Sequence, residues 1–303
     1  MARSDNLQLR ILRELSPSRA APSSYLRPTY SDVAKRLGVD EETIRVRVAK
    51  AQRAGTILGW RVALNPRLLG REATSVVVDI NDSSSKPSII AQIKLIDEVI
   101  LVMDFYEKPL RVIFCHENER DKARRLDLIK AVCGDKNPVS WRMRFDSCNA
   151  KLKRTDWQIL KALRRDSMQS NAEIGDEVRV SARTVRRRLA FMAQERAIYA
   201  FAIGNVSRVP GVIHSFLVKS ANGKKRDVDE KVLSRMENVV FVDNSDNPFS
   251  SYAAVYHNMG EADETLRWIR SQEGVEDVKM FIMRELIAVD SWFDKEIDRG
   301  LGE

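Results

Sequence analysis

Two segments of the chain carry apolar residues at helical spacing along one face. One segment follows Asp40 and the other follows Ser181, and both of these polar residues are good helix N-caps. Apolar residues at i, i+4 and i+7 lie on one face of a helix and predict packing against a core. The two stripes are Ile44, Val48 and Ala51 in the first segment and Val185, Leu189 and Met192 in the second.

Two shorter helices are predicted before each of these segments. The first helices are expected over about residues 7–15 and 155–163. The second helices are expected to begin at a polar cap and to end at a turn, from Ser31 to near Gly38 and from Asn171 to near Arg179. A short turn between the second and third helices is the helix-turn-helix arrangement.

A β-rich run follows each third helix, over residues 56–64 and 197–206, and ends before Gly70 and Gly211. Beyond these glycines, short apolar runs alternate with amphipathic stretches. The first half predicts strands over 74–80, 98–105, 110–116 and 139–145, with helices over 88–96 and 119–132. The second half predicts strands over 212–220, 238–244, 250–257 and 275–283, with helices over 227–236 and 261–271. The order β-α-β-β-α-β is that of the ferredoxin-like unit.

The two halves of the chain match one another when the sequence is shifted by 141 residues. Identical pairs are Val39/Val180, Thr43/Thr184, Arg45/Arg186, Arg47/Arg188, Ala49/Ala190 and Ile57/Ile198. The first copy contains an extra stretch within residues 16–28, which is rich in Pro and Ser and is expected to form a loop. The sequence therefore predicts an internal duplication.

The predicted fold class is α+β, with two copies of a winged or helix-turn-helix domain, each followed by a ferredoxin-like domain. The expected domains are residues 1–70, 71–150, 151–211 and 212–303. Val289, Trp292, Phe293 and Ile297 share one face of a C-terminal helix in the last domain. We interpret this as a packing helix, and a helix that docks a partner is the alternative.

The charge is divided unevenly among these domains. Residues 1–70 hold 13 Lys and Arg against 6 Asp and Glu, and residues 151–211 hold the same numbers, so each block is +7. The net charge of the chain is +8, so the remaining residues are −6. Two basic blocks on an acidic remainder are typical of a nucleic-acid binder with separate non-binding modules.

Other function classes find little support in the composition. Three scattered cysteines (Cys115, Cys133 and Cys148) predict neither a disulfide framework nor a zinc site, and we expect no metal and no cofactor. No apolar run approaches the roughly 18 residues of a membrane span. The N-terminal residues lack the apolar core of an export signal. We therefore expect a protein of the reducing cytoplasm, associated with the nucleoid, with no membrane partner.

A helix-turn-helix with V-x-x-x-T-[VI]-R-x-R on its third helix, a β run, a glycine and then β-α-β-β-α-β resembles the Lrp/AsnC family of prokaryotic transcription factors. The resemblance covers almost the whole chain, twice. Members of that family usually carry one copy and dimerise through the ferredoxin-like domain, so this chain resembles a covalent pseudo-dimer. The resemblance implies a sequence-specific DNA-binding regulator without enzymatic activity, and double-stranded DNA as its partner.

The resemblance fails at one place in each ferredoxin-like domain. The family commonly has a Gly-containing turn between the second and third strands, near its amino-acid site. The corresponding stretches here, 104–111 and 243–251, contain no glycine. This departure counts against amino-acid sensing, so a small-molecule effector is only an alternative. A homodimer of the whole chain also stays open.

Most of the candidate DNA-binding residues lie on the third helices, and two lie at the start of a second helix. With Val185 and its stripe facing the core, Arg183 and Arg187 point away from it, where arginine can bond to guanine O6 and N7. Arg186 lies on one flank, and Arg188 lies on the other flank, where it either binds DNA or supports the structure. The remaining candidates in the second copy are Ser170, Asn171, Ser181 and Thr184, with phosphates at the second helix as the expected ligands of the first two.

The third helix of the first copy is less basic on the same face. Glu42, Val46, Ala49 and Lys50 are expected to face outward, with Arg45 on the flank. The candidate residues here are Thr43, Arg45, Arg47 and Lys50. We expect the second helix-turn-helix to contribute more affinity, while the first reads a different half-site or mainly supports the assembly.

Two alternative functions remain open from the sequence. Siroheme decarboxylases resemble the same architecture, and such an enzyme would need histidines and arginines lining a cavity. The chain has His116, His214 and His257; the first and last were expected at matching strand ends on the surface. The other alternative is an architectural protein that binds DNA without sequence preference, which flat affinity across sequences would favour.

Overall fold

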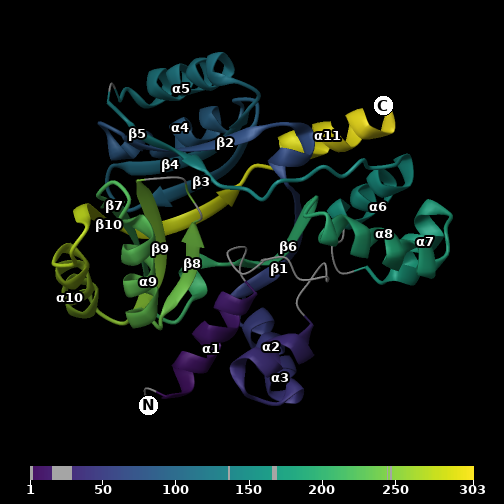
Figure 1. Cartoon of the computed structure of the whole chain (residues 1–303), viewed down its shortest axis with the longest axis horizontal. Coiled ribbons are helices and arrows are strands. Elements are labelled where there is room, and N and C mark those ends of the chain that lie inside the picture. The colour runs from purple at the N-terminus through teal and green to yellow at the C-terminus, as the bar shows by residue number, and fades with distance from the viewer. Residues whose placement is uncertain (1–2, 16–28, 136, 166–168, 244, 246–247) are drawn as a thin grey trace.

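The computed structural model describes residues 3–15, 29–135, 137–165, 169–243, 245 and 248–303. Figure 1 shows two separate helical units, α1–α3 and α6–α8, beside a body built from strands with helices on its outside. The predicted loop at residues 16–28 lies outside the described residues.

The first half of the chain contains three helices and then a strand-rich part. The helical unit is α1 (Arg3–Glu14), α2 (Tyr30–Leu37) and α3 (Glu41–Arg53), followed by β1 (Ile57–Leu64) and the 3-10 turn η2 (Pro66–Leu69). The strand-rich part is β2 (Glu72–Asp79), η3 (Ser83–Ser85), α4 (Lys86–Ile93), β3 (Val99–Phe105), β4 (Pro109–His116), α5 (Glu119–Cys133) and β5 (Val139–Met143).

The second half has the same order of elements and one extra helix. Its helical unit is α6 (Arg154–Arg165), α7 (Asn171–Val178) and α8 (Ala182–Gln194), followed by β6 (Ile198–Gly204) and η4 (Val206–Arg208). Its strand-rich part is β7 (Val212–Ser220), α9 (Lys225–Arg235), β8 (Val239–Asp243), β9 (Phe249–Tyr256), α10 (Met259–Arg270) and β10 (Val275–Ala288), and α11 (Ser291–Leu301) ends the chain.

Eight strands form one sheet in the order β5-β2-β4-β3-β10-β7-β9-β8. Each half contributes four neighbouring strands in the order expected of a β-α-β-β-α-β unit. The long strand β10 joins them, because Val275–Ile282 pairs with β7 and Met283–Ala288 pairs with β3, both antiparallel. Met143, the last residue of the edge strand β5, forms a β-bridge with Ser245, which lies just after the other edge strand β8. The two outer edges of the sheet therefore also meet.

The two halves of this sheet face one another across a shared apolar layer. Trp141 on β5 lies 5.2 Å from Phe249 on β9, and Phe105 on β3 lies 5.2 Å from Phe281 on β10, between ring centroids. The other face of each half is covered by its own helices, α4 and α5 in one half and α9 and α10 in the other. The halves therefore form a continuous core.

A buried arginine crosses the layer between the halves. Arg111 on β4 forms an ion pair with Asp243 on β8 and lies 4.8 Å above the ring of Trp141. Its guanidinium also donates hydrogen bonds to the hydroxyls of Ser75 at 2.7 Å and Ser251 at 3.0 Å. Burial raises the pKa of the Asp243 carboxyl, and the neighbouring guanidinium opposes that rise.

The two helical units contact each other through one antiparallel strand pair. β1 and β6 form a two-stranded sheet, with Trp60 opposite Ala202 and Leu64 opposite Ile198. Strand β1 takes part in the cores of both units, because Trp60 packs with α1–α3 and Leu64 packs with α6–α8. The pair ties the two units together at their inner ends (Figure 1).

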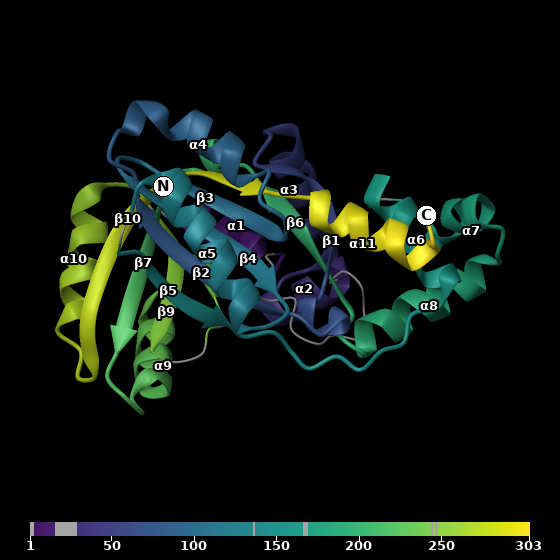
Figure 2. The ribbon, with the colours of Figure 1, turned by 90° about the horizontal axis from the view of Figure 1, so that it is seen from above.

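The C-terminal helix α11 packs on the second helical unit, as the predicted packing role requires. Trp292, Phe293 and Ile297 are buried in the same core as α6 and α8, and Val289 is buried against the first half of the sheet. Figure 2 shows α11 bridging the strand-rich body and the α6–α8 unit. At its outer end Gly300 lies directly against the indole of Trp157 on α6.

Most predicted element positions agree with the structure, and the differences are local. The second helices begin earlier than predicted, because the capping residues are Thr29 and Ser170 in place of Ser31 and Asn171. Strand β10 continues five residues beyond the predicted end at residue 283. These extra residues pair with β3 of the other half, which no local pattern could indicate.

Replacing Gly300 with alanine should loosen the contact between α11 and α6. A Cβ at this position would lie 2.3 Å from the Trp157 ring, so one of the two helices must shift. We expect a loss of about 1–3 kcal/mol in the free energy of unfolding, despite the better helix propensity of alanine. Urea denaturation measures it, with Gly204→Ala as the matched control, since a Cβ at Gly204 meets nothing within 4 Å. An equal effect of both substitutions would contradict this packing.

Candidate nucleic-acid interface

Helices α7 and α8 form a compact helix-turn-helix whose ends are fixed by side-chain caps. The hydroxyl of Ser170 accepts a hydrogen bond from the backbone N–H of Glu173, and the carboxylate of Glu173 accepts one from the N–H of Ser170. The Ser181 hydroxyl accepts a hydrogen bond from the N–H of Thr184 at 3.2 Å and starts α8. Between the helices, Arg179 adopts a left-handed conformation with φ of 58°.

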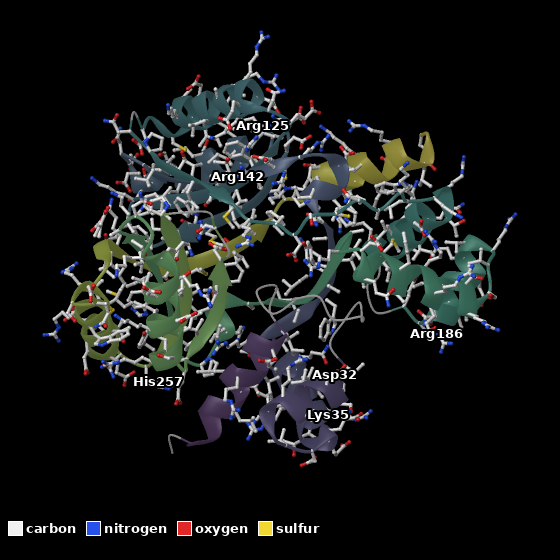
Figure 3. All side chains as sticks on the ribbon, viewed as in Figure 1. Asp32, Lys35, Arg125, Arg142, Arg186 and His257 are labelled. Atoms are coloured by element: carbon white, nitrogen blue, oxygen red, sulfur yellow. The ribbon has the colours of Figure 1, made fainter. Side chains whose placement is uncertain are left out.

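The outer face of α8 presents three arginines to solvent. Arg183, Arg186 and Arg187 are exposed, whereas Val185, Leu189 and Met192 are buried. None of the three has a carboxylate within ion-pair distance among the described residues. Figure 3 shows Arg186 at the outer surface of the α6–α8 unit, away from the sheets. Three guanidiniums that form no ion pair with the described residues leave this helix face strongly positive, and such groups can bind an anion.

Arg188 has a different environment from its three neighbours. Its Nε and Nη2 donate to the two carboxylate oxygens of Asp156 on α6, each at 2.5 Å. Asp156 is fully buried, and the Arg188 side chain is only 16% exposed. The hydrogen bonds that the guanidinium donates to Asp156 raise its pKa. This geometry supports the structural role for Arg188, the second of the two roles considered from the sequence.

Sequence reasoning missed Asp156 altogether. Its carboxylate also accepts a hydrogen bond from the backbone N–H of Lys153 at 2.6 Å, so it fixes the start of α6 as well as α8. An acidic residue in the first turn of a helix predicts a capping role, but only the packing of α6 on α8 shows that it also holds Arg188.

The polar candidates at the helix starts are already used within the chain. Ser170 and Ser181 cap their own helices, and the hydroxyls of Ser181 and Thr184 lie 3.0 Å apart. Asn171 is the first residue of α7 and is half-buried. Phosphate binding by these residues stays a prediction.

Helix α3 of the first unit shows a different outer face. Arg45 occupies the position equivalent to Arg186, but its guanidinium pairs with Glu41 at 2.7 Å and with Glu42 at 3.1 Å. Val46, equivalent to Arg187, is an exposed apolar residue. Two carboxylates thus offset the charge of Arg45.

The remaining candidates on α3 also differ in their surroundings. Thr43 donates its hydroxyl proton to the N-cap residue Asp40 at 2.7 Å, and that hydrogen bond holds the pKa of the Asp40 carboxyl below its usual value. Arg47 is half-buried and Lys50 is exposed. The face as a whole is less positive than that of α8.

The turn between β3 and β4 is formed without glycine, and Glu107 takes the left-handed conformation there. Beside it, the buried ammonium of Lys86 donates to Asp104 at 2.9 Å and to two backbone oxygens, of Phe105 and Pro109. The buried charges of Lys86 and Asp104 therefore satisfy one another within the chain.

Of the two histidines expected at the surface, His257 is exposed just beyond β9 and His116 is not. His116 is the last residue of β4 and is buried, 2.9 Å from the Thr74 hydroxyl, so a surface position was wrong for it. His116 lies two residues before Asn118, the N-cap of α5, and Tyr256 lies two residues before Asn258, the N-cap of α10. Tyr256 is therefore the structural equivalent of His116, and the exposed His257 is the next residue. Burial lowers the pKa of His116.

The other histidine and the cysteines in the described part of the chain belong to no metal site. His214 is buried and its pKa is lowered by burial. No cluster of three or more His, Cys, Asp and Glu residues capable of holding a metal is present among the described residues. The three cysteines are buried and unpaired, and burial raises the pKa of Cys133 to about 12, so its thiol is unreactive at neutral pH.

The geometry of the second helical unit agrees with a comparison against protein-family models. The model of the AsnC-type helix-turn-helix domain matches residues 152–192, from just before α6 to near the end of α8. Residues 152–192 are an AsnC-type helix-turn-helix domain. Arg183, Arg186, Arg187 and Arg188 all belong to it. The family model matches no part of α1–α3, so the assignment holds for the second unit.

Curated relatives agree with this AsnC-type domain. The regulatory protein AsnC of Escherichia coli (strain K12) is 33% identical over 96 residues, which are 31% of this chain and 59% of that protein. The HTH-type transcriptional regulator Ptr1 of Methanocaldococcus jannaschii is 27% identical over 96 residues, 32% of this chain and 60% of that protein. The match spans less than two thirds of the length of either relative. The chain is homologous to AsnC/Lrp regulators over about a third of its length.

Among solved structures, the crystal structure of the siroheme decarboxylase NirDL matches the whole arrangement. It covers 98% of this chain and 100% of that chain, with a TM-score of 0.58 and 13% sequence identity. At this identity the likeness shows a shared fold. No helix in the described residues has the length and apolar character to cross a membrane.

The ion pair between Arg188 and Asp156 should stabilise the AsnC-type domain strongly. Asp156→Ala leaves a mostly buried guanidinium without its partner and should cost about 2–4 kcal/mol in the free energy of unfolding. Adding Arg188→Ala removes the buried charge that has lost its partner. The double variant should therefore lose about 1–3 kcal/mol less free energy of unfolding than the two single variants lose together. A double-mutant cycle in urea measures this coupling. A coupling near zero would mean that the pair does not hold α6 to α8.

Proposed function

We propose that this protein is a sequence-specific DNA-binding transcription regulator of the Lrp/AsnC type. Helix α8 enters the major groove of duplex DNA and reads base edges with Arg183 and Arg187, while Arg186 contacts the phosphate backbone. The observation that carries the proposal is the exposed face of α8 in the AsnC-type domain, where three arginines make no ion pair with any residue that the structure describes.

The chemistry of these side chains fits duplex DNA. A guanidinium presents a planar fork of donors that matches guanine O6 and N7 or two phosphate oxygens. In a docked helix-turn-helix, residues near the start of the second helix of the motif meet base edges, and Arg183 is the second residue of α8. The block of +7 around the domain adds long-range attraction to a polyanion.

We further propose that the chain arose by internal duplication and acts as a covalent pseudo-dimer, with domains at 1–70, 71–150, 151–211 and 212–303. The repeat at a shift of 141 residues and the repeated element order support this proposal. In each helical unit the third helix has a Ser or Asp N-cap followed three residues later by Thr. Joined sheets let one polypeptide satisfy the interface that separate chains would otherwise form, and a homodimer of the whole chain is not required.

The two helical units contribute unequally in this proposal. In α3 the arginine that matches Arg186 is paired with Glu41 and Glu42, and an exposed valine stands at the position of Arg187. DNA must displace these carboxylates before it can use Arg45. The AsnC-type domain therefore supplies most of the affinity, and the first unit supports the assembly or reads a weaker half-site.

The direct test is a titration of duplex DNA with the whole chain over a salt series. For the variant Arg183→Ala with Arg187→Ala, each lost base contact should cost about 1–3 kcal/mol of binding free energy. Fluorescence anisotropy measures the affinity, and log affinity should fall linearly with log salt for the wild type. The preferred sequence is then selected from random duplexes.

A matched pair of single variants tests the role of helix-face charge. Arg186→Ala and Arg45→Ala remove the same side chain at equivalent positions of α8 and α3. We expect Arg186→Ala to lower the salt slope by about 1, while Arg45→Ala changes it little because its charge is already neutralised by Glu41 and Glu42. Equal losses would contradict the unequal roles. Absence of duplex binding by the wild type at low salt would overturn the regulator proposal.

The shared fold with a siroheme decarboxylase supports a second candidate, an enzyme acting on a tetrapyrrole. The three histidines do not fit such a site well. His116 is hydrogen-bonded inside the sheet, His214 is buried with its Nδ1 3.2 Å from the Val212 carbonyl oxygen, and His257 is exposed beyond a strand end. The absorption spectrum of the protein with added siroheme is the test. A change in the siroheme absorption bands on binding, together with loss of carboxyl groups from the tetrapyrrole, would favour the enzyme.

A further inference from the structure

Two arginines of the second helical unit occupy left-handed backbone positions that the first unit fills with glycine. Arg179 ends α7 with φ of 58°, and Arg196 follows α8 with φ of 56°. At the shift of 141 residues their equivalents are Gly38 and Gly55, with φ of 68° and 70°. The backbone at each position is thus the same in the two units, and only the side chain differs.

An L-residue with a side chain is strained in this conformation, whereas glycine is not. The first unit shows that this chain can form both turns with glycine. A strained residue that the surrounding structure tolerates is a reason to ask what its side chain does. Each of the two arginines therefore needs an explanation beyond the turn itself.

Arg196 has its explanation within the protein. Its guanidinium forms an ion pair with Asp146 at 2.9 Å, and Asp146 lies in the segment that links β5 to α6. Its backbone carbonyl also accepts a hydrogen bond from the side chain of Asn65 at 2.8 Å. Arg196 thus attaches the helical unit to the segments that connect it with the sheets.

Arg179 has no such partner. Its side chain is exposed and makes no hydrogen bond, ion pair or ring contact among the described residues, and only its backbone N–H is used, toward Gly175. A cation at the end of α7 gains a little from the helix dipole, but Gly38 shows that the equivalent helix ends without one. The turn that holds Arg179 lies two residues before Ser181, the N-cap of α8.

We propose that Arg179 binds a phosphate of the DNA backbone at the entrance of α8 into the groove, as a positioning contact absent from the first helical unit. The proposal rests on the DNA-binding function proposed above. The turn places the arginine next to the start of the reading helix, where the phosphates flanking the contacted bases pass. A guanidinium is suited to this because it can donate two parallel hydrogen bonds to one phosphate.

The experiment measures duplex affinity and thermal stability for Arg179→Gly, Arg179→Ala and Arg179→Lys in the whole chain. Glycine and alanine should both weaken binding roughly five- to tenfold near 0.1 M salt and lower the salt slope by about 1, and should do so on any duplex sequence. Lysine keeps the charge and should retain most of the affinity.

Thermal stability separates this role from a structural one. Arg179→Gly should melt at a higher temperature than Arg179→Ala by a few degrees, because alanine keeps the strained backbone and glycine relieves it. The two variants should nevertheless bind DNA equally weakly. A purely structural role for Arg179 predicts instead that affinity follows stability, and that result would overturn the proposal.

Arg196→Gly is the matched control, since it makes the same change at the same kind of backbone position. It should leave the salt slope unchanged, because the Arg196 guanidinium is paired with Asp146. Wild-type affinity and slope in Arg179→Gly, or an equal loss in Arg196→Gly, would overturn the assignment to Arg179. If the wild type itself does not bind duplex DNA, the proposed DNA-binding function is contradicted, and the role of Arg179 with it.

Discussion

The pairing of β10 with two different strands is the constraint on which the rest of the molecule depends. Its first part completes the second half of the sheet beside β7, and its last residues pair with β3 of the first half. This single strand makes one sheet from two units and brings Arg111 opposite Asp243 in the shared core. It also directs the chain toward α6, where α11 then packs.

This route of β10 makes the two helical units inequivalent. The outer side of α6 is covered by α11, with Arg164 paired to Asp294 at 2.8 Å. The corresponding helix α1 packs directly on the second half of the sheet, where Leu9 is buried beside Ile213 and Val255. The helices α3 and α8, which have similar sequences, therefore belong to units that are held in different surroundings, as Figures 1 and 2 show.

The difference in surroundings is matched by a difference in charge. The arginines on the outer face of α8 have no protein partners among the described residues, while Arg45 on α3 has two. Charges that are already paired contribute little to an anionic ligand, because the ligand must compete with the partner carboxylate. The asymmetry of the proposed DNA binding follows from this pairing, even though each block carries the same formal charge of +7.

Much of this architecture follows from local sequence patterns. The stripes headed by Ile44 and Val185, the N-caps Asp40 and Ser181, and the β-α-β-β-α-β order all depend on neighbouring residues, and these predictions are confirmed. The remaining features of the architecture depend on contacts between chain segments that are far apart in the sequence. The last residues of β10 are mostly exposed and carry no strand pattern of their own, so their pairing with β3 could not be foreseen.

The candidate site was likewise predictable where local helical geometry determines it, and not where distant residues do. Helical geometry alone placed Arg183 and Arg187 outward and Arg188 nearer the core. It could not show that Arg188 is held by Asp156, because that carboxylate comes from a helix 32 residues earlier. The partners of Arg45 could have been recognised from its spacing to Glu41 and Glu42 along one helix. The burial of His116 required the register of the sheet.

The most direct test of the central claim is DNA cleavage from a tethered iron chelate on each reading helix. The equivalent residues Ala190 and Ala49 are replaced by cysteine in separate variants, and the native cysteines are all buried and so protected from labelling. We predict strong cleavage over a short stretch of duplex from position 190 on α8 and weak cleavage from position 49 on α3. Absence of cleavage from position 190, or stronger cleavage from position 49, would contradict the account.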